Sequence, residues 1–153
     1  VRDRVFSTAG MKDTDSYEVD AHVPNLATGY VPIETEDGVK FERENIFLHS
    51  ARGTPAGGGY STAEDLLRFD RALRSNTLLS PAFTRFFFTG FDGDPSTGPL
   101  DGGVGFAGGG PGINAVLEME FDEDITVIVL SNYDPPAAEE LGSPIMQMVR
   151  GMD

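Results

Sequence analysis

The residues most suggestive of chemistry are the glycines of 108–112, a run that only Pro111 interrupts. A strand that ends in glycines lets another molecule approach its backbone closely, because no side chain stands in the way. Exposed amide groups on such a strand can bind a carboxylate or stabilise an oxyanion. A tight connection between two strands, without a ligand, is the alternative, and both interpretations stay open. A phosphate-binding loop is disfavoured, because the run lacks a Gly-Lys-Ser/Thr end and precedes a predicted strand.

Side chains that commonly carry hydrolytic chemistry are poorly placed for it. No serine lies in the Gly-x-Ser-x-Gly pattern that marks the nucleophile of many Ser-His-Asp hydrolases. His22 and His49 lie in segments of weak periodicity, so we interpret both as surface or hydrogen-bonded histidines rather than catalytic bases. The sequence has no cysteine, which excludes a thiolate nucleophile, a disulfide framework and a cysteine-rich zinc site.

Five carboxylates gather in one short stretch: Glu118, Glu120, Asp122, Glu123 and Asp124. A calcium-binding EF-hand needs regularly spaced oxygen ligands, a central glycine and a closing glutamate, and this stretch lacks that arrangement. We therefore interpret it as the charged tip of a hairpin, which protects a sheet edge from pairing with another chain. No bound metal and no other cofactor are expected.

The composition fits one folded domain that does not bind polyanions. The chain has 153 residues, 25 of them acidic and 11 basic, and a formal net charge of −14. Nucleic acid and anionic membrane surfaces are disfavoured as partners, because binding either depends on clustered lysines and arginines. The apolar stretches are far shorter than the roughly 20 residues that a membrane helix needs, so no membrane insertion is expected. Residues 1–11 lack the apolar core of a signal peptide.

Predicted strands flank the glycine run. They cover 104–108, 114–121 and 125–133. The acidic turn at 122–124 joins the last two as a hairpin. Because residues 125–130 are apolar on both faces, we expect this strand to lie inside a sheet that is covered on both sides. A helix over 136–149, bent near Gly142 and Pro144, is predicted to close the chain.

Helices are predicted upstream of this sheet. Ser61 is predicted to cap a helix that ends near Asn76, by accepting from the amide three residues later. A second helix, capped by Ser80, covers 82–88. The remaining predictions are the end of a helix at 1–6, short strands at 27–32 and 39–48, a glycine-rich loop at 53–60 and a polar loop at 89–103. The expected fold class is α/β (α+β), with helices packed on a small antiparallel sheet.

Five segments carry a resemblance to a known family. In chain order they are AGMKDT (9–14), ATGY (27–30), PAGGGYSTAEDLLRF (55–69), GFAGGGPGIN (105–114) and VIVLSNYD (127–134). Together they resemble the C-terminal half of the serine β-lactamase family, and more narrowly the branch of class C β-lactamases, D-alanyl-D-alanine carboxypeptidases and related esterases. The resemblance implies a partial β-lactamase/transpeptidase-like fold, with residues 1–153 as a single incomplete domain.

The first two motifs of that family are absent from the sequence. Ser-x-x-Lys supplies the acylated serine in the family, but Lys12 and Lys40 have Ala9 and Asp37 three positions earlier. Tyr-x-Asn is missing as well, since no tyrosine has an asparagine two positions later. Either the chain is a fragment that starts after these motifs, as a helix beginning at Val1 favours, or the natural protein has lost them and kept a binding surface.

The third family motif is Lys/His-x-Gly, and it matches Phe106-Ala107-Gly108. Phe106 stands where the family has lysine or histidine, and its ring can neither donate a proton nor pair with a substrate carboxylate. The resemblance implies that the amide after the motif glycine, at Gly109, completes an oxyanion hole. The implied oxyanion- and substrate-binding residues are therefore Phe106, Ala107, Gly108 and Gly109, with no catalytic side chain.

The resemblance implies a parent serine hydrolase, which is acylated and deacylated by a β-lactam, a peptidoglycan stem peptide or a small ester. The chain alone is expected to be inactive, because covalent catalysis needs a nucleophile and its base. A noncatalytic binding or interaction module is the alternative, and it would use the strand edge at 108–112 and the loop at 53–60. A periplasmic or envelope location follows from the resemblance only.

Self-association is also expected. In the complete family fold, N-terminal strands and a helix complete the sheet, so their absence would uncover an apolar face and an unpaired edge. The residues at risk include Val127, Ile128, Val129 and Leu130. Such edges pair with other chains, and a second copy can satisfy them about a two-fold axis. Burial of apolar area should outweigh the repulsion between acidic chains, which salt screens beyond about 8 Å.

Overall fold

The structure, a computed structural model, describes residues 1–89 and 103–151. Its elements in chain order are the π-helical turn η1 (Arg2–Phe6), α1 (Ser7–Ala9), β1 (Tyr30–Glu34), β2 (Lys40–Glu44), the 3-10 turn η2 (Ile46–Leu48), α2 (Ala63–Arg74), α3 (Pro81–Thr89), β3 (Gly103–Gly110), β4 (Ile113–Glu120), β5 (Ile125–Ser131) and α4 (Glu139–Val149). The predicted polar loop at 89–103 lies outside the described residues except for its two ends, which belong to α3 and β3.

The chain divides into two compact units. Unit 1 comprises Val1–Thr14, Ser61–Phe106 and Leu117–Ile128, and unit 2 comprises Asp15–Tyr60, Ala107–Val116 and Val129–Asp153. Each of the three long strands, β3, β4 and β5, contributes residues to both units. No helix in the described part of the chain is long and apolar enough to cross a membrane.

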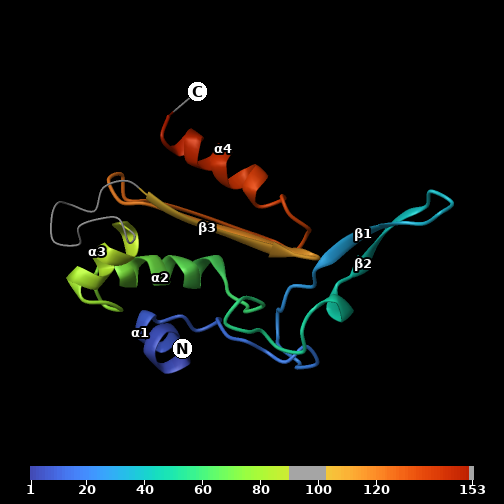
Figure 1. Cartoon of the computed structure of the whole chain (residues 1–153), viewed down its shortest axis with the longest axis horizontal. Coiled ribbons are helices and arrows are strands. Elements are labelled where there is room, and N and C mark those ends of the chain that lie inside the picture. Colours follow the sequence, from blue (N-terminus) through green and yellow to red (C-terminus); the bar gives the residue numbers. More distant parts are fainter. Residues whose placement is uncertain (90–102, 152–153) are drawn as a thin grey trace. The chain divides into compact units, whose positions relative to one another are not determined.

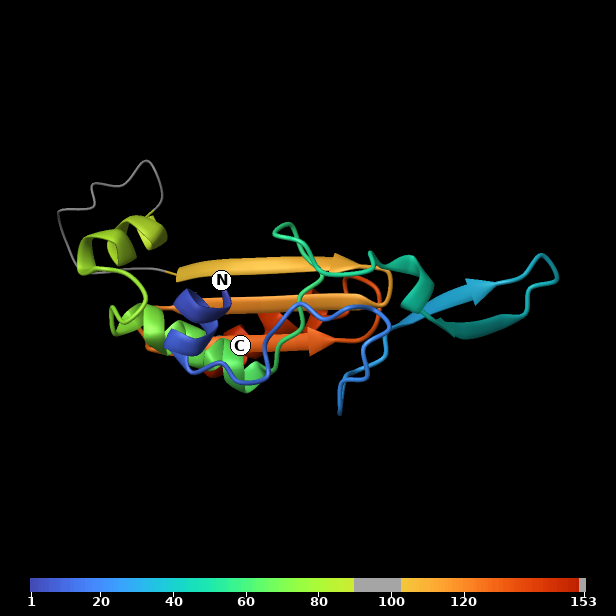
Figure 2. The ribbon, with the colours of Figure 1, turned by 90° about the horizontal axis from the view of Figure 1, so that it is seen from below.

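A three-stranded sheet has the order β3-β4-β5 (Figure 2). Residues 111–112 and 121–124 connect successive strands, and such short connections require antiparallel neighbours. Leu117 and Met119, two residues apart on β4, are both buried on one face of the central strand. The expected fold class and the pairing of the three predicted strands are therefore confirmed.

β5 lies at an edge of this sheet, which corrects the expectation that it has neighbours on both sides. Its strand neighbour among the described residues is β4 alone. Val127 is buried, Ile128 and Val129 are half-buried, and Leu130 is 43% exposed. The expectation that these apolar side chains are uncovered is therefore wrong for Val127 and right for Leu130. An apolar pattern on both faces shows that a strand can be buried, but the available neighbours decide how much of it is.

α2 is the long helix of unit 1, and its N-cap is Thr62 rather than the predicted Ser61. Thr62 Oγ1 accepts from Asp65 N–H at 3.2 Å, and the Thr62 backbone is extended, as is usual for an N-cap. Ser61 Oγ lies 2.8 Å from Thr14 Oγ1 instead. Ser61 and Thr62 both carry a hydroxyl that could cap the helix. Because the hydroxyl of Ser61 contacts Thr14, Thr62 is the residue that caps it. The chain leaves the helix before Asn76, as predicted.

The N-terminal segment of unit 1 packs beside α2. Figure 1 shows η1 and α1 next to this helix, which confirms the predicted helical start of the chain. Gly10 ends α1 in a left-handed conformation with φ of 73°, and Met11 is buried immediately after it. α3 begins at Pro81, and Ser80 Oγ accepts from Phe83 N–H at 3.5 Å, so the predicted cap of this helix is confirmed.

Unit 2 contains a second sheet with two strands. β1 and β2 run antiparallel, side by side in Figure 1, with Pro32 opposite Glu42. The strand predicted at 27–32 thus begins later and continues past the proline, which an edge strand tolerates. The strand predicted at 39–48 is shorter than expected, because η2 replaces its C-terminal part.

α4 begins at Glu139, three positions after the predicted start at 136, because residues 135–138 form a turn. Gly142 is buried inside this helix, whereas Leu141 beside it is 55% exposed. Pro144 lies within the helix as well. The predicted C-terminal helix is therefore confirmed, and it presents apolar surface to solvent.

Candidate functional site

The four predicted site residues, Phe106 to Gly109, are consecutive in β3, and all four are exposed. β3 lies at an edge of its sheet: β4 pairs with one side, and no strand among the described residues pairs with the other. The strand therefore presents unpaired backbone along its outer edge, including its glycine-rich end.

Two neighbouring glycines of β3 have opposite surroundings. A Cβ atom at Gly109 would come within 2.4 Å of Pro135 Cγ and within 3.0 Å of both Asn114 Nδ2 and Ile113 O. A Cβ atom at Gly108 would meet no atom within 4 Å. A side chain at position 109 would therefore force its surroundings to shift, whereas the space beside Gly108 is open for another molecule.

Asn114 holds this part of β3 from the neighbouring strand. Its side chain is 1% exposed, its Nδ2 donates to Gly108 O at 3.0 Å, and its Oδ1 accepts from Ala138 N–H at 2.6 Å. Burial of an amide is costly without hydrogen bonds, and here both ends have partners. Sequence reasoning missed this residue. The available signal was an asparagine at the first position of a predicted strand, an element in which asparagine is disfavoured.

The turn after the glycines is held by two polar side chains of unit 2. Asn45 Nδ2 donates to Pro111 O at 2.9 Å, and Asp134 Oδ1 accepts from Gly112 N–H at 2.6 Å. Gly112 has a φ of 69°, a left-handed conformation that favours glycine. The glycine-rich end of β3 is thus fixed from segments far away in the sequence, although its own composition would allow it many conformations.

Phe106 belongs to an aromatic cluster of unit 1. Its ring centroid lies 6.0 Å from that of Phe87 on α3, a separation typical of interacting rings. Phe87 meets Phe88 edge-to-face at 5.0 Å, and Phe88 lies 4.2 Å from Phe121. Phe106 is still 45% exposed, so it offers an apolar surface at the position where the resembled family has lysine or histidine.

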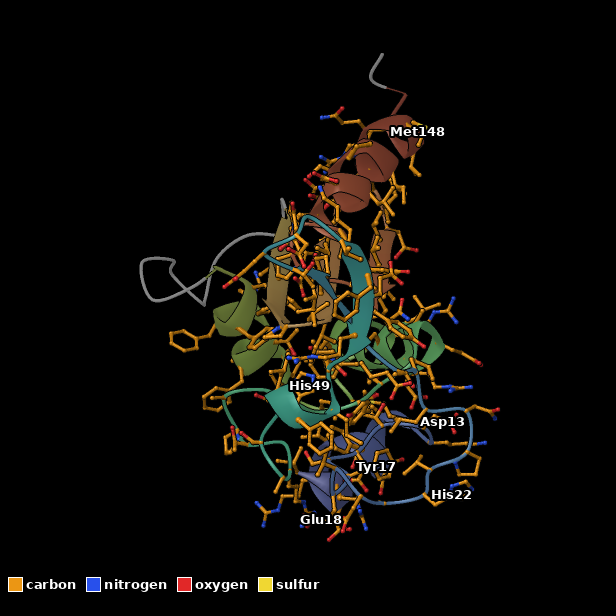
Figure 3. All side chains as sticks on the ribbon, turned by 90° about the vertical axis from the view of Figure 1, so that its right-hand side faces the viewer. Asp13, Tyr17, Glu18, His22, His49 and Met148 are labelled. Carbon is orange, nitrogen blue, oxygen red and sulfur yellow. The ribbon has the colours of Figure 1, made fainter. Side chains whose placement is uncertain are left out.

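The two histidines lie well apart in Figure 3, and neither belongs to β3. His22 is exposed and His49 is half-buried. Their assignment as noncatalytic residues stays a prediction.

The glycine-rich segment at 53–60 is a loop, as predicted, with its own internal hydrogen bonds. Thr54 N–H donates to Gly57 O at 2.8 Å, and Gly57 N–H returns a bond to Thr54 O at 3.0 Å. At the end of the loop, Tyr60 and Asp15 exchange backbone hydrogen bonds of 2.8 and 3.1 Å. The loop is therefore tied to the start of unit 2, and its use as a binding surface stays a prediction.

Asp65 is a fully buried carboxylate at the start of α2. Its Oδ2 accepts from Asp13 N–H at 2.7 Å and Thr14 Oγ1 at 2.8 Å, and its Oδ1 accepts from Arg68 Nη1 at 2.6 Å. Burial alone would raise the pKa of this carboxyl, but the hydrogen bonds from Thr14, Asp13 and Arg68 outweigh burial and lower the pKa below 3.8. Asp65 is thus an ionised anchor that fixes the turn at 11–14 on α2, and sequence reasoning did not identify it.

The acidic hairpin tip at 122–124 is exposed, and Asp124 Oδ1 lies 3.5 Å from Arg74 Nη1. Across the described ranges, no group of three or more histidine, aspartate or glutamate side chains is arranged to hold a metal ion. The ion pair with Arg74 comes from α2, so the tip is part of the contact between this helix and the hairpin.

Two solved structures are similar to this fold. The crystal structure of a penicillin-binding protein from Bacillus halodurans matches with a TM-score of 0.73 at 21% sequence identity, covering 99% of this chain and 48% of that chain. The octameric penicillin-binding protein homologue from Pyrococcus abyssi matches with a TM-score of 0.72 at 17% identity, covering 99% of this chain and 37% of that chain. The chain therefore shares their fold and spans less than half the length of either protein.

In sequence, no curated protein matches the chain. The family model described as Beta-lactamase matches residues 1–145. The match includes the five segments that carry the resemblance to serine β-lactamases, and it extends over nearly the whole sequence. The chain belongs to the beta-lactamase family.

Proposed function

We propose that the chain is the C-terminal part of a serine hydrolase that works through an acyl-enzyme, with the N–H of Gly109 as one donor of its oxyanion hole. Membership of the beta-lactamase family supports the class of reaction. The substrate would be a small amide or ester, such as a β-lactam, a peptidoglycan stem peptide or a simple ester.

The orientation of one peptide unit carries this proposal. Gly108 O accepts from the side chain of Asn114 on β4, so this carbonyl points toward the interior of the sheet. In a trans peptide the carbonyl and the N–H point in opposite directions, so the N–H of Gly109 points toward the outer edge of β3. No described strand pairs with that edge. An unpaired amide in such a position is suited to stabilise the anionic oxygen of a tetrahedral intermediate.

The chemistry needs more groups than this chain supplies. In acyl transfer, a serine hydroxyl adds to the carbonyl carbon, and collapse of the tetrahedral intermediate releases the amine or alcohol. Water then attacks the acyl-enzyme and releases the acid. The chain contributes a donor for the oxyanion and an apolar wall at Phe106, but its sequence lacks the Ser-x-x-Lys and Tyr-x-Asn motifs. The chain alone is therefore proposed to be inactive.

Covalent labelling tests the proposal. The purified chain should not acquire a stable label on any serine from a fluorescent penicillin or a fluorophosphonate. Reading the coding sequence upstream of Val1 should reveal both missing motifs, and a longer protein that includes them should be labelled at the serine of the first motif. Stable labelling of the chain alone would contradict the proposal that the chain is inactive. An upstream sequence without either motif would contradict the proposal that the chain is part of a serine hydrolase.

Phe106 favours a second candidate, a noncatalytic binding module derived from the same fold. Its ring cannot replace the lysine or histidine of the third motif, and it packs against Phe87. In that case the exposed edge of β3 would bind a ligand without reacting with it. The same upstream sequence separates the two candidates, because a binding module does not need the nucleophile motif.

A further inference from the structure

Asn114 connects β3 to α4 through a single buried side chain. Its Nδ2 donates to Gly108 O, and its Oδ1 accepts from the N–H of Ala138, the N-cap of α4. The orientation of the amide is unambiguous, because a backbone N–H can only donate and therefore selects the oxygen of Asn114. The nitrogen must then face Gly108 O. The bond to Ala138 thus fixes the direction of the donor that reaches β3.

The bond to Gly108 O acts directly on the N–H of Gly109, since both groups belong to one peptide unit. A donor on the carbonyl resists rotation of the peptide plane, so it fixes the direction in which the N–H points. It also polarises the peptide, and hydrogen bonds that share a peptide group strengthen one another. Asn114 therefore influences both the direction and the strength of a donor that lies on the opposite side of β3.

We propose that Asn114 is a positioning residue for the Gly109 amide, which it holds toward the open edge of β3 and strengthens as a donor. The catalytic meaning of this role rests on the proposed function, because only there does the Gly109 amide bind an oxyanion. The physical claim, that Asn114 controls this one N–H, stands on the hydrogen bonds alone.

Asn45 provides a matched control, because it holds the turn that follows β3. It is also buried, with 7% of its surface exposed, and its Nδ2 donates to another backbone carbonyl, Pro111 O, at 2.9 Å. The peptide unit that it touches carries the N–H of Gly112. At a pH where the new carboxyl is ionised, Asn114→Asp and Asn45→Asp each remove one side-chain donor while keeping the shape of the side chain. The two variants therefore differ in which peptide unit loses its donor.

NMR spectroscopy of the full chain tests this inference. In the wild-type chain, a scalar coupling across the hydrogen bond should connect Asn114 Nδ2 with the carbonyl carbon of Gly108. In Asn114→Asp, the amide resonance of Gly109 should move upfield as its peptide loses polarisation, while that of Gly112 stays in place. In Asn45→Asp, the amide of Gly112 should move and that of Gly109 should stay.

Each outcome decides the inference. An unmoved Gly109 amide in folded Asn114→Asp would overturn it, and so would equal shifts of Gly109 in both variants, because a merely structural role predicts that result. If Asn114→Asp does not fold, the wild-type coupling decides: its presence supports the role and its absence overturns it. The proposed function fails separately, since an unlabelled longer protein would refute the hydrolase and leave these resonances unchanged.

Discussion

Arg74 Nε donates to both carboxylate oxygens of Asp70, at 2.7 and 2.9 Å, one helical turn earlier on α2. The same guanidinium extends to the β4–β5 hairpin, where Nη2 donates to Glu120 O at 3.0 Å and to Ile125 O at 3.3 Å. It also lies 4.4 Å from the ring centroid of Phe121. Arg74 therefore joins the last turn of α2 to the hairpin, and Asp70 fixes its direction.

Arg74→Met should lower the free energy of unfolding by about 3 kcal/mol, because it leaves the carboxylate of Asp70 buried without its partner. Asp70 is only 2% exposed, and the hydrogen bond that its Oδ2 accepts from Thr126 Oγ1, at 2.8 Å, does not neutralise its charge. Urea unfolding measures the change. Arg71→Met is the control, since Arg71 is exposed on the same helix and its loss should cost less than about 0.5 kcal/mol. Equal losses in the two variants would contradict the assigned role.

Asp65 should make the stability of the chain depend on acid pH. Its folded-state pKa lies below the ordinary value of 3.8, so its contribution is fully present above that value and is lost as the pH falls through the folded pKa. Asp65→Asn should cost about 2 kcal/mol at neutral pH, typical of hydrogen bonds to a charged group. The difference in unfolding free energy between wild type and variant should shrink below about pH 4.

The neighbouring Glu64 is the control for this measurement. Its carboxylate is exposed and pairs with Arg68, which also binds Asp65. Glu64→Gln should change the unfolding free energy by less than about 1 kcal/mol, because exposed ion pairs contribute little. A wild-type-to-Asp65→Asn difference that is constant from pH 2 to pH 7 would show that the carboxyl of Asp65 does not titrate with folding.

Alanine substitution should have different effects at Gly108 and Gly109, two neighbouring glycines of β3. Gly109→Ala should lower the free energy of unfolding by about 2 kcal/mol, because the new methyl group overlaps Pro135 and forces a shift of the surrounding backbone. Gly108→Ala should stay within about 0.5 kcal/mol of wild type, since its methyl group enters open space. Similar effects of both substitutions on the urea midpoint would refute the steric difference.

Self-association through the exposed edge of β5 can be tested with Leu130, which is 43% exposed. Light scattering should find a dimer or higher oligomer whose stability rises with salt, because salt screens the repulsion between chains of net charge −14. Leu130→Lys should shift the population toward monomer, since a charge on an edge strand opposes pairing. Val39→Lys is the control, because Val39 is exposed in the β1–β2 connection. A wild-type monomer at low and high salt would contradict the expectation.

Local sequence signals predicted most of the elements, and distant contacts decided what they missed. The alternation and the acidic turn around Asp122 were sufficient for the β4–β5 hairpin. The cap of α2 moved from Ser61 to Thr62 because Thr14, 47 positions before Ser61, occupies the first hydroxyl. A contact at that separation leaves no periodic signal in the sequence.

The candidate site was predicted in part for a similar reason. Motif order placed Phe106, Ala107 and Gly108 on a predicted strand, and β3 contains all three, while their roles and that of Gly109 stay predictions. Asn114 escaped notice because its importance depends on Ala138 and Gly108, whose proximity only the folded chain reveals. Buried polar side chains are identified by their partners, and a single sequence does not name those partners.

The division into two units has a spectroscopic consequence. All four tyrosines, Tyr17, Tyr30, Tyr60 and Tyr133, lie in unit 2, where they form two ring pairs, and the chain has no tryptophan. The tyrosine band of near-ultraviolet circular dichroism therefore reports on unit 2 alone, whereas unit 1 contributes only phenylalanine bands. If both bands are followed during heating, they distinguish unfolding of the two units in one cooperative step from unfolding of one unit before the other. The measurement needs no added label, because the chain already contains these chromophores.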